Sequence, residues 1–348
     1  MKKYIYVLIL SFIILILGIG CTSTLTKEDL EKYPGTGLEL LPRTGTAEYG
    51  QLKVIGSQLC DSEGNPVQLR GMSSAGLQWF GQFMNKESIT WLKEDWKIKV
   101  IRAAMYTASD GYISYRSYAE KVLTIVDAAI DLGIYAIIDW HILQDGNPNK
   151  YKEEAIGFFR DMATIYNDTE NVIYEICNEP NGQGVSWKET IKPYAKDVIE
   201  AIRLIDPDAI IIVGTATWSQ DINLAATDPL SGSNIMYACH FYAHSHTGWL
   251  RDRISGCING AFGKKIAIFV SEWGTTDYTG NTNFNPESSE EWINFLDKNK
   301  ISWVNWSLCN KREGSAALKP NASFYGNWDP SDLTPSGTLV RSFIIRDR

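Results

Sequence analysis

Two glutamates come directly after apolar runs that lie far apart in the chain. Glu179 follows the run at 172–178, and Glu272 follows the run at 266–271. If these runs are buried strands of one sheet, the two carboxyl groups reach the same cavity. Such a pair can cleave a glycosidic bond, because one acid protonates the leaving oxygen while the other meets positive charge at the anomeric carbon. Mutual repulsion helps to separate their pKa values, which this chemistry requires.

Other polar and aromatic residues lie at the ends of the remaining runs. Arg102, within the run at 100–105, is a candidate to keep one of the two glutamates ionised. Trp79, Trp218 and Trp306 lie at or after the first, fifth and eighth runs, where flat rings can floor a cleft several sugars long. Core packing is the alternative for each tryptophan, because large aromatic side chains also fill barrels.

Three of the four histidines are close in the sequence, at His240, His244 and His246. Such a cluster can suggest a metal, but a mononuclear site needs converging ligands with open geometry. His240 ends an apolar run, whereas the other two fall in the segment beyond it. We therefore expect no metal and no cofactor.

Eight short apolar runs, several rich in Val and Ile, must position these residues. They cover 68–72, 100–105, 134–140, 172–178, 210–214, 235–241, 266–271 and 301–306. Segments of helical periodicity separate them, clearest at 115–132, 153–166, 187–205 and 286–299. Eight strand–helix units predict an α/β fold, a (β/α)8 TIM barrel. An open doubly wound sheet is the alternative, although neither GxGxxG nor GxxxxGK follows any run.

An antiparallel hairpin is expected before the first barrel strand. Two strand-like runs, 52–56 and 67–70, flank the turn-forming segment DSEGNP at 61–66. No second linker or repeat interrupts the chain after this point. We therefore expect one catalytic domain over residues 49–348.

The first 20 residues have the pattern of a secretory signal peptide. Lys2 and Lys3 precede an apolar run at 5–19, and Gly20 before Cys21 resembles a lipoprotein processing site that leaves Cys21 as the first mature residue. Secretion without a lipid and an uncleaved anchor are the alternatives; the run is shorter than the ~20 residues of a spanning helix. All three place the domain outside the cytoplasm, and we expect a lipid-anchored protein that is extracellular or at the cell surface. Residues 21–48 are expected to be a flexible tether.

Composition limits the partners. The 348 residues include 33 Lys and Arg against 41 Asp and Glu, a net charge of −8. This balance offers no basic stripe for phosphate backbones, so we expect no nucleic-acid partner. The sparse cysteines after Cys21 do not form a disulfide framework, and Cys177, Cys239 and Cys309 are expected to be small buried hydrophobes. We expect a monomer that touches the membrane only through its leader or lipid.

Seven motifs resemble those of glycoside hydrolase family 5, and within it the bacterial endo-β-1,4-glucanases. They are RGMSSAGLQWF at 70–80, IRAAMYT at 101–107, IDWHILQDGNP at 138–148, IYEICNEPNG at 173–182, HFYAHSH at 240–246, VSEWGT at 270–275 and WVNWSL at 303–308. They run in order through nearly the whole domain. NEP after a fourth strand combined with SEWG after a seventh is highly specific, whereas either alone is weak.

The resemblance implies a role for each central residue. Glu179 is similar to the family's acid/base and Glu272 to its nucleophile. Arg102 and Tyr242 resemble the residues that orient and ionise the nucleophile, and His240 resembles the partner of the acid/base. The implied reaction is hydrolysis of internal β-1,4 bonds of cellulose or related soluble β-glucans. It proceeds by double displacement with retention, for which the carboxyl groups stand about 5 to 5.5 Å apart.

The resemblance also implies the sugar contacts. Asn178 is similar to the residue that hydrogen-bonds the 2-hydroxyl of the attacked sugar, His141 to another sugar contact, and Trp306 to the platform beneath that sugar. The remaining expected substrate contacts are Trp79, Tyr106, Trp218, Lys311 and Glu313.

One position departs from the family pattern. Similar enzymes usually carry a histidine that touches sugar hydroxyls at the place of Ala75. Losing one such contact costs on the order of 1 kcal/mol, a several-fold loss of affinity. Two alternatives stay open: mannanase- or xylanase-type activity on the same scaffold, and a non-hydrolytic glycan-binding lipoprotein. Ala75 is the feature that favours the second, and the two glutamates oppose it.

Overall fold

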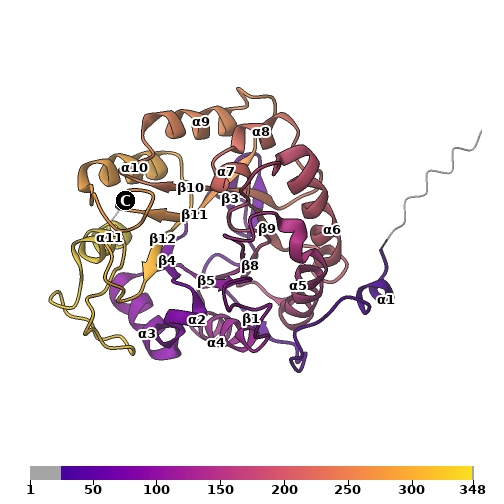
Figure 1. Cartoon of the computed structure of the whole chain (residues 1–348), viewed down its shortest axis with the longest axis horizontal. Helices are drawn as coiled ribbons and strands as arrows, with labels where there is room; N and C mark the ends of the chain where they lie inside the picture. Colours follow the sequence, from indigo (N-terminus) through magenta and orange to yellow (C-terminus); the bar gives the residue numbers. More distant parts are fainter. Residues whose placement is uncertain (1–24, 347–348) are drawn as a thin grey trace, which may run out of the picture.

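The computed structural model describes residues 25–346, and a closed barrel of eight parallel strands forms its centre (Figure 1). The strands are β4 (Arg70–Ser74), β5 (Val100–Tyr106), β6 (Tyr135–His141), β8 (Val172–Glu175), β9 (Ile210–Val213), β10 (Ile235–Tyr242), β11 (Ala267–Gly274) and β12 (Trp303–Leu308). β12 pairs in parallel with β4, which closes the sheet. The (β/α)8 barrel is confirmed, and closure excludes the open doubly wound sheet.

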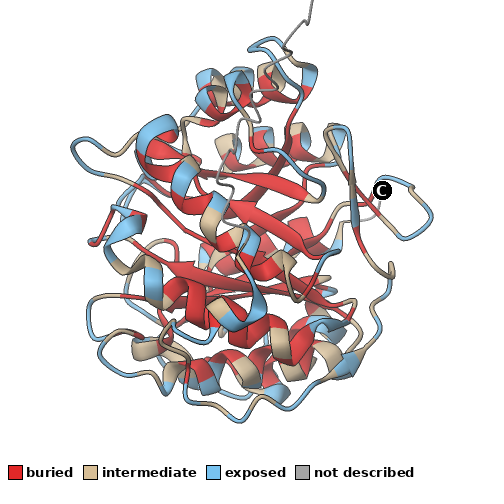
Figure 2. Ribbon diagram, turned by 90° about the vertical axis from the view of Figure 1, so that its right-hand side faces the viewer, coloured by how far each residue is buried: buried red, intermediate tan, exposed pale blue. Residues whose placement is uncertain are grey.

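Helices surround the barrel and bury its outer face (Figures 1 and 2). The longer ones are α4 (Tyr118–Asp131), α5 (Lys152–Tyr166), α6 (Lys192–Arg203), α9 (Gly248–Asn259), α10 (Pro286–Lys298) and α11 (Pro335–Ile345). Shorter helical segments are α2 (Leu77–Phe80), η1 (Gly81–Phe83), α3 (Lys86–Trp91), η2 (Leu92–Trp96), η3 (Pro148–Tyr151), η4 (Trp187–Ile191), α7 (Ala216–Ser219) and α8 (Ile222–Thr227). All four helices expected from periodicity are present. Local chemistry sets their starts: Asn285 caps α10 by accepting the Ser288 N–H, and Pro286 follows it.

The inward-facing side chains change character along each barrel strand. On β6, Tyr135 and Ile137 near the start are followed on the same face by Asp139 and His141. The apolar inward residues form one cluster, which we call the lower core. Its barrel members are Val100, Tyr135, Ile137, Ile173, Ile210, Ile212, Met236, Ala238, Ala267, Phe269 and Val304. Polar side chains fill the carboxyl-terminal half above it.

A bulge in β11 sends two consecutive side chains into the barrel. The register between β10 and β11 shifts between the pairs Ala238–Phe269 and His240–Glu272, so β11 contains one extra residue. Strand side chains normally alternate between faces, but here Ser271 and Glu272 both contact interior groups. The bulge therefore places a hydroxyl and a carboxylate side by side in the polar half of the barrel.

The expected hairpin is present, but its second strand was predicted wrongly. β2 (Lys53–Ile55) pairs antiparallel with β3 (Gln58–Cys60) across a tight turn in which Gly56 has φ +64°. The run at 67–70 instead leads into β4, and the segment taken as the turn carries a single bridge between Cys60 and Pro66. A left-handed glycine suffices for a two-residue turn. The longer DSEGNP segment was therefore wrongly predicted to be the turn of the hairpin.

Residues 25–48 pack against the side of the barrel, which corrects the flexible tether expected over 21–48. α1 (Lys27–Leu30) lies on α5 and buries Leu30, and β1 (Thr44–Gly45) pairs with β7 (Asp168–Thr169). The N–H and the hydroxyl of Thr36 both donate to the buried carboxylate of Asp161. The polar residues that resemble a linker thus make specific hydrogen bonds.

Other expectations from the amino-terminal region concern residues that the structure does not describe. The predicted signal peptide at 1–20 and the lipidation site at Cys21 lie outside residues 25–346. Within that range, no helix combines the length and apolar character needed to cross a bilayer. Cys177, Cys239 and Cys309 are buried and unpaired, as predicted.

Candidate active site

A cleft of about 570 Å³ opens at the carboxyl ends of the barrel strands. All but two of the predicted site residues line it: Trp79, Tyr106, His141, Glu179, Trp218, His240, Tyr242, Glu272, Trp306, Lys311 and Glu313. The two exceptions, Arg102 and Asn178, are fully buried behind its floor. Strand ends far apart in the sequence therefore meet at one cavity.

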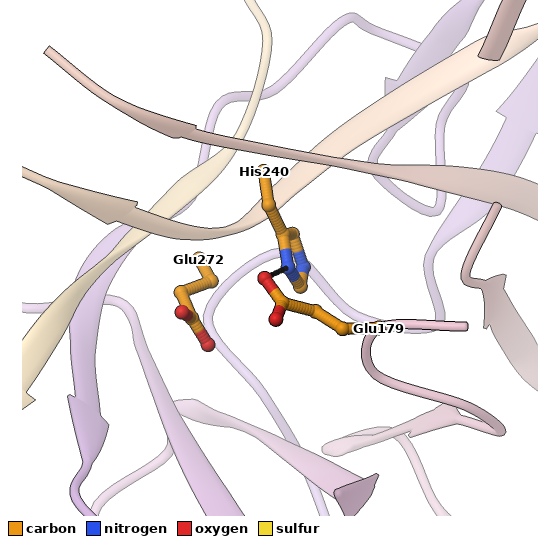
Figure 3. A group of neighbouring side chains, drawn as sticks. All are labelled: Glu179, His240 and Glu272. Atoms are coloured by element: carbon orange, nitrogen blue, oxygen red, sulfur yellow. Dashed lines mark hydrogen bonds and ion pairs between the residues drawn. The ribbon is translucent and has the colours of Figure 1, made fainter. Parts of the chain in front are cut away.

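The two predicted catalytic glutamates face one another across the floor of the cleft. Glu179 lies in the loop after β8, and Glu272 lies on β11; they are 8% and 4% exposed. One oxygen of each carboxylate and one ring nitrogen of His240 all lie within 4.8 Å of one another. Figure 3 shows the carboxylates directed into the space between them, with the imidazole beside Glu179. Both carboxylates have little solvent-exposed surface, but both line the cleft, so a ligand bound there can contact them.

Arg102 and Tyr242 hold the carboxylate of Glu272. Arg102 Nη1 donates to Glu272 Oε2 at 3.2 Å, and the Tyr242 hydroxyl donates to Oε1 at 3.0 Å. Burial and the nearby negative charges raise the pKa of Tyr242, so its hydroxyl remains a donor. Both contacts fix the orientation of the Glu272 carboxylate, and Arg102 places a positive charge beside it. This agrees with the roles that the resemblance implies for Arg102 and Tyr242.

Arg102 is also the centre of a larger buried charge network. Its guanidinium lies 2.7 Å from Glu175 Oε2 and 2.9 Å from Asp139 Oδ2, and it donates to Asn178 Oδ1 at 2.7 Å. Burial alone would lower the pKa of Arg102, but these carboxylates together with Glu272 raise it, so the side chain stays cationic. A single cation therefore serves three carboxylates inside the barrel.

A second hydrogen-bonded chain supports Glu179 from behind. His240 Nδ1 lies 3.0 Å from Glu179 Oε1, and His240 Nε2 lies 2.9 Å from Ser271 Oγ. The Ser271 hydroxyl donates to Glu175 Oε1 at 2.6 Å. Burial opposes a charge on the imidazole, but the carboxylates of Glu179 and of Glu175, whose Oε1 lies 3.6 Å from Nε2, prevail and raise the pKa of His240 to about 9. At neutral pH an imidazolium therefore lies beside Glu179.

His141 is neutral, in contrast to His240. Burial and the charge of Arg102 lower the pKa of His141 to about 3. Its Nδ1 lies 2.6 Å from Asp139 Oδ2, and its ring stacks on Trp306 with centroids 5.3 Å apart. Its Nε2 faces the Asn178 amide nitrogen at 3.3 Å. At neutral pH, His141 beside Arg102 is therefore neutral, whereas His240 beside Glu175 and Glu179 is positively charged.

Asn178 is occupied by the protein itself. Besides accepting from Arg102, its amide nitrogen donates to the Ile142 carbonyl at 3.0 Å, and its side chain has no exposed surface. The predicted contact with a sugar 2-hydroxyl therefore stays a prediction. In the structure, Asn178 connects Arg102 to the His141 side of the cleft.

Aromatic rings and one ion pair form the walls of the cleft. Trp79 and Trp218 are half-exposed at 51% and 46%, and Trp79 packs edge-on to Tyr106. Lys311 Nζ and Glu313 Oε2 form an ion pair at 2.5 Å. Exposed rings beside hydroxyl-binding charges suit a sugar chain, whose faces are apolar and whose edges are polar.

The floor near Ala75 is apolar. Ala75 lines the cleft and clusters with Cys309 and Ala316, against which Phe80 packs. None of these side chains provides the hydroxyl contact that the resemblance assigns to a histidine at this place. The departure predicted from the sequence thus leaves a hydrophobic surface in the cleft.

The histidine cluster noted in the sequence does not converge on one point. His244 Nδ1 faces the Asn285 amide, and His246 Nδ1 accepts the Tyr242 N–H at 2.8 Å. Within residues 25–346, the group with possible metal ligands is Glu179, His240 and Glu272. A protonated His240 has no free lone pair for a metal. These groups are better arranged for proton transfer.

Sequence reasoning assigned no role to Glu175, Ser271 or Asp139. All three are fully buried and contact Arg102 or His240. The available signal was an acidic residue inside an apolar run, Glu175 in IYEIC and Asp139 in IIDWH. A buried strand accepts a carboxylate only where a cation pairs with it.

The chain is similar to known proteins along most of its length. Residues 60–312 match the family model described as Cellulase (glycosyl hydrolase family 5). An endoglucanase of Clostridium saccharobutylicum is 56% identical over 311 residues, and endoglucanase A of Evansella cellulosilytica is 55% identical over 281 residues. The alignments cover 89% and 81% of this chain, and 68% and 57% of those two proteins. The chain thus corresponds to part of each relative.

A solved structure shares the arrangement. The catalytic domain of an endoglucanase from Thermobifida fusca, a variant in complex with cellotetraose, is 39% identical with a TM-score of 0.80. The match covers 85% of this chain and 97% of that one. The structural similarity therefore extends over most of this chain.

Proposed function

The chain belongs to glycosyl hydrolase family 5, the cellulase family, and from this premise we propose that it is an endoglucanase that hydrolyses internal β-1,4 bonds of cellulose or related soluble β-glucans. One observation carries the proposal: two carboxylates and an imidazole lie within 4.8 Å of one another on the floor of an aromatic-lined cleft. The cellotetraose complex of the Thermobifida fusca relative supports a β-1,4-glucan substrate.

We propose that hydrolysis proceeds by double displacement with retention. Glu272, ionised beside Arg102 and Tyr242, attacks the anomeric carbon while Glu179 donates its proton to the leaving oxygen. Glu179 then deprotonates the water that hydrolyses the glycosyl–Glu272 ester. The short separation of the two carboxylates supports this route, since an inverting pair needs about 6.5 to 9.5 Å to admit a water.

The nucleophile variant tests the activity. We expect Glu272→Gln to lower reducing-sugar release from carboxymethylcellulose by at least about 10⁴-fold, because the covalent step is lost while the shape of the site is kept. Glu189→Gln, on an exposed side chain away from the cleft, is the matched control and should equal the wild type. Equal release from wild type and Glu272→Gln would refute the proposal and favour a glycan-binding protein.

Product stereochemistry tests the mechanism separately. Proton NMR of the first products from cellohexaose should show the β-anomer before mutarotation. The α-anomer as first product would contradict retention while leaving the endoglucanase activity intact. Initial rates on carboxymethylcellulose, mannan and xylan then test the substrate class, and we expect the β-glucan to be preferred.

We also propose that the protein is exported and held at the cell surface as a lipid-anchored monomer. The charged start, the apolar run at 5–19 and Gly20-Cys21 support this location. In cells, wild-type protein should partition into the detergent phase of Triton X-114, and Cys21→Ser should move to the aqueous phase. Identical partitioning of both would refute acylation. Light scattering of the soluble domain tests the monomer.

A further inference from the structure

Tyr278 is the most exposed large hydrophobic side chain of the described residues, and it lies in the cleft. Its side chain is 73% exposed, yet it belongs to the lining of the cavity that contains Glu179 and Glu272. It sits in the loop between β11 and α10, only six positions after Glu272. Tyr278 takes no part in the charge networks around Glu179 and Glu272, so these networks do not explain why an aromatic ring is exposed at this place.

The loop around Tyr278 is held in place by its own hydrogen bonds. The Asp277 carboxylate accepts from the N–H and hydroxyl of Thr279, from the Thr282 hydroxyl and from the Asn283 amide at 2.5 to 3.0 Å. Four donors on one side chain fix the backbone on both sides of the ring. An exposed aromatic residue on a fixed loop loses little conformational entropy when it binds a ligand.

Two neighbouring loops clamp the same segment. The Tyr278 N–H donates to Ser245 Oγ at 3.0 Å, in the loop that follows β10. On the other side, the Ser315 N–H donates to the Gly280 carbonyl at 2.9 Å. Ser315 belongs to the segment after β12 that also carries Lys311 and Glu313. Tyr278 is therefore part of one wall with this ion pair.

The barrel order indicates which side of the scissile bond this wall serves. In the proposed mechanism Glu179 protonates the leaving oxygen, which assigns the leaving part of the sugar chain to the side of β8, after which Glu179 comes, and of β9, which Trp218 follows. In the closed order, β11, β12 and β4 are on the opposite side of the barrel from β8. The wall with Tyr278 therefore faces the part of the substrate that becomes bonded to Glu272, the non-reducing side.

We propose that the Tyr278 ring is a stacking platform that forms an additional sugar-binding subsite on the non-reducing side of the cleft. The ligand is a β-linked pyranose unit, whose apolar face covers the ring while Lys311 and Glu313 contact hydroxyls at its edge. The inference rests on the proposed endoglucanase function. It adds a residue that binds substrate without taking part in bond cleavage.

The test measures how much each added sugar unit improves cleavage. The substrates are 4-nitrophenyl β-glycosides of glucose, cellobiose, cellotriose and cellotetraose, which lengthen the chain only on the non-reducing side. In wild type, kcat/KM for aglycone release should rise with length. In Tyr278→Ala one of these increments should shrink by about 2- to 10-fold, while the shorter substrates below that step are unchanged.

Two further variants control for ring chemistry and for general effects. Tyr278→Phe keeps the ring and should retain at least half of the increment. Tyr325→Ala removes a ring that is 60% exposed outside the cleft, and it should behave as wild type. A Tyr278→Ala variant whose increments all match those of wild type would overturn the inference. So would an equal loss on every substrate, because that pattern indicates damage to the catalytic carboxylates.

The outcomes separate this inference from the proposed function. If wild type cleaves none of the aryl cellosides and no soluble β-glucan, the endoglucanase proposal fails. If wild type cleaves them and Tyr278→Ala does so with the same increments, only the subsite is wrong. Thermal unfolding of the variant should match wild type, because the side chain is largely in solvent.

Discussion

The two halves of the barrel interior are built from the same strands but hold opposite kinds of side chain. In the lower core, Ile137, Ile212 and Phe269 pack with other apolar residues and have almost no exposed surface. Two residues further along β6, Asp139 joins the network around Arg102. Ile137 and Asp139 are equally buried, so the difference between them is one of chemistry and not of depth.

This contrast shows what each half demands of its residues. An apolar core tolerates changes that keep its volume, and each lost methyl group costs a limited amount. A buried charge network is stable only when every member is paired, so losing one partner leaves others unpaired. The polar half should therefore be sensitive to charge and pH, and the lower core only to volume.

Removal of the central cation should give the largest effect. We expect Arg102→Met to lower the free energy of unfolding by about 3 to 5 kcal/mol at neutral pH and to abolish activity, because three buried carboxylates lose their cation. Burial already raises the pKa of Asp139, and without that cation it would also raise the pKa of Glu175, which Arg102 now helps to hold at about 2. Stability of the variant is therefore lost as pH rises and partly regained as pH falls. Urea unfolding at pH 5 and pH 8 measures this.

A surface arginine provides the control for that experiment. Arg341 forms a part-exposed pair with Asp95, so Arg341→Met should cost less than about 1 kcal/mol at either pH. If the deficit of Arg102→Met were the same at pH 5 and pH 8, the residue would act through packing, and the contrast between the two halves would lose its electrostatic basis.

A truncation in the lower core should change stability alone. Ile212 is fully buried there, and Ile212→Ala should cost about 2 to 5 kcal/mol of unfolding free energy. At temperatures well below unfolding, kcat/KM on a soluble β-glucan should equal the wild-type value, and the deficit should not vary with pH. A fall in kcat/KM in the folded variant would contradict the independence of the two halves.

The smallest effect should be a pH slope that depends on His240. Its pKa of about 9 lies above the unfolded value near 6.5, so its contribution is fully present below pH 6.5 and is lost as pH rises through 9. Between these limits wild-type stability should fall by on the order of 2 kcal/mol more than that of His240→Gln. Parallel stability curves for the two proteins would show that His240 is not an imidazolium in the folded state.

The same contrast explains how far the sequence predicted the structure. The lower core and the outer layer consist of continuous apolar runs, so the eight strands and the main helices could be predicted from periodicity. Glu179 and Glu272 stand at strand ends, where barrel topology directs attention, and their convergence was predicted as well. Residues that follow a regular sequence pattern could thus be predicted.

What could not be predicted depends on exceptions to a pattern. The bulge in β11 turns Glu272 inward beside Ser271. Strict alternation from the inward-facing Ala267 and Phe269 would have placed Ser271 inside but Glu272 outside. The packing of residues 25–48 depends on single contacts such as Thr36 with Asp161, which are distant in the sequence. Such features follow from three-dimensional partners, and no local signal in one sequence encodes them.

The two carboxylates that we propose as catalytic each lie beside a cation, Glu272 beside Arg102 and Glu179 beside His240. In the proposed first step, Glu272 loses its negative charge by becoming an ester, and Glu179 gains one by giving up its proton. The total charge of the pocket is therefore constant while one unit moves from the arginine side to the histidine side. Because a cation already lies beside each carboxylate, neither the charge of Glu272 before this step nor that of Glu179 after it is left unpaired in the pocket.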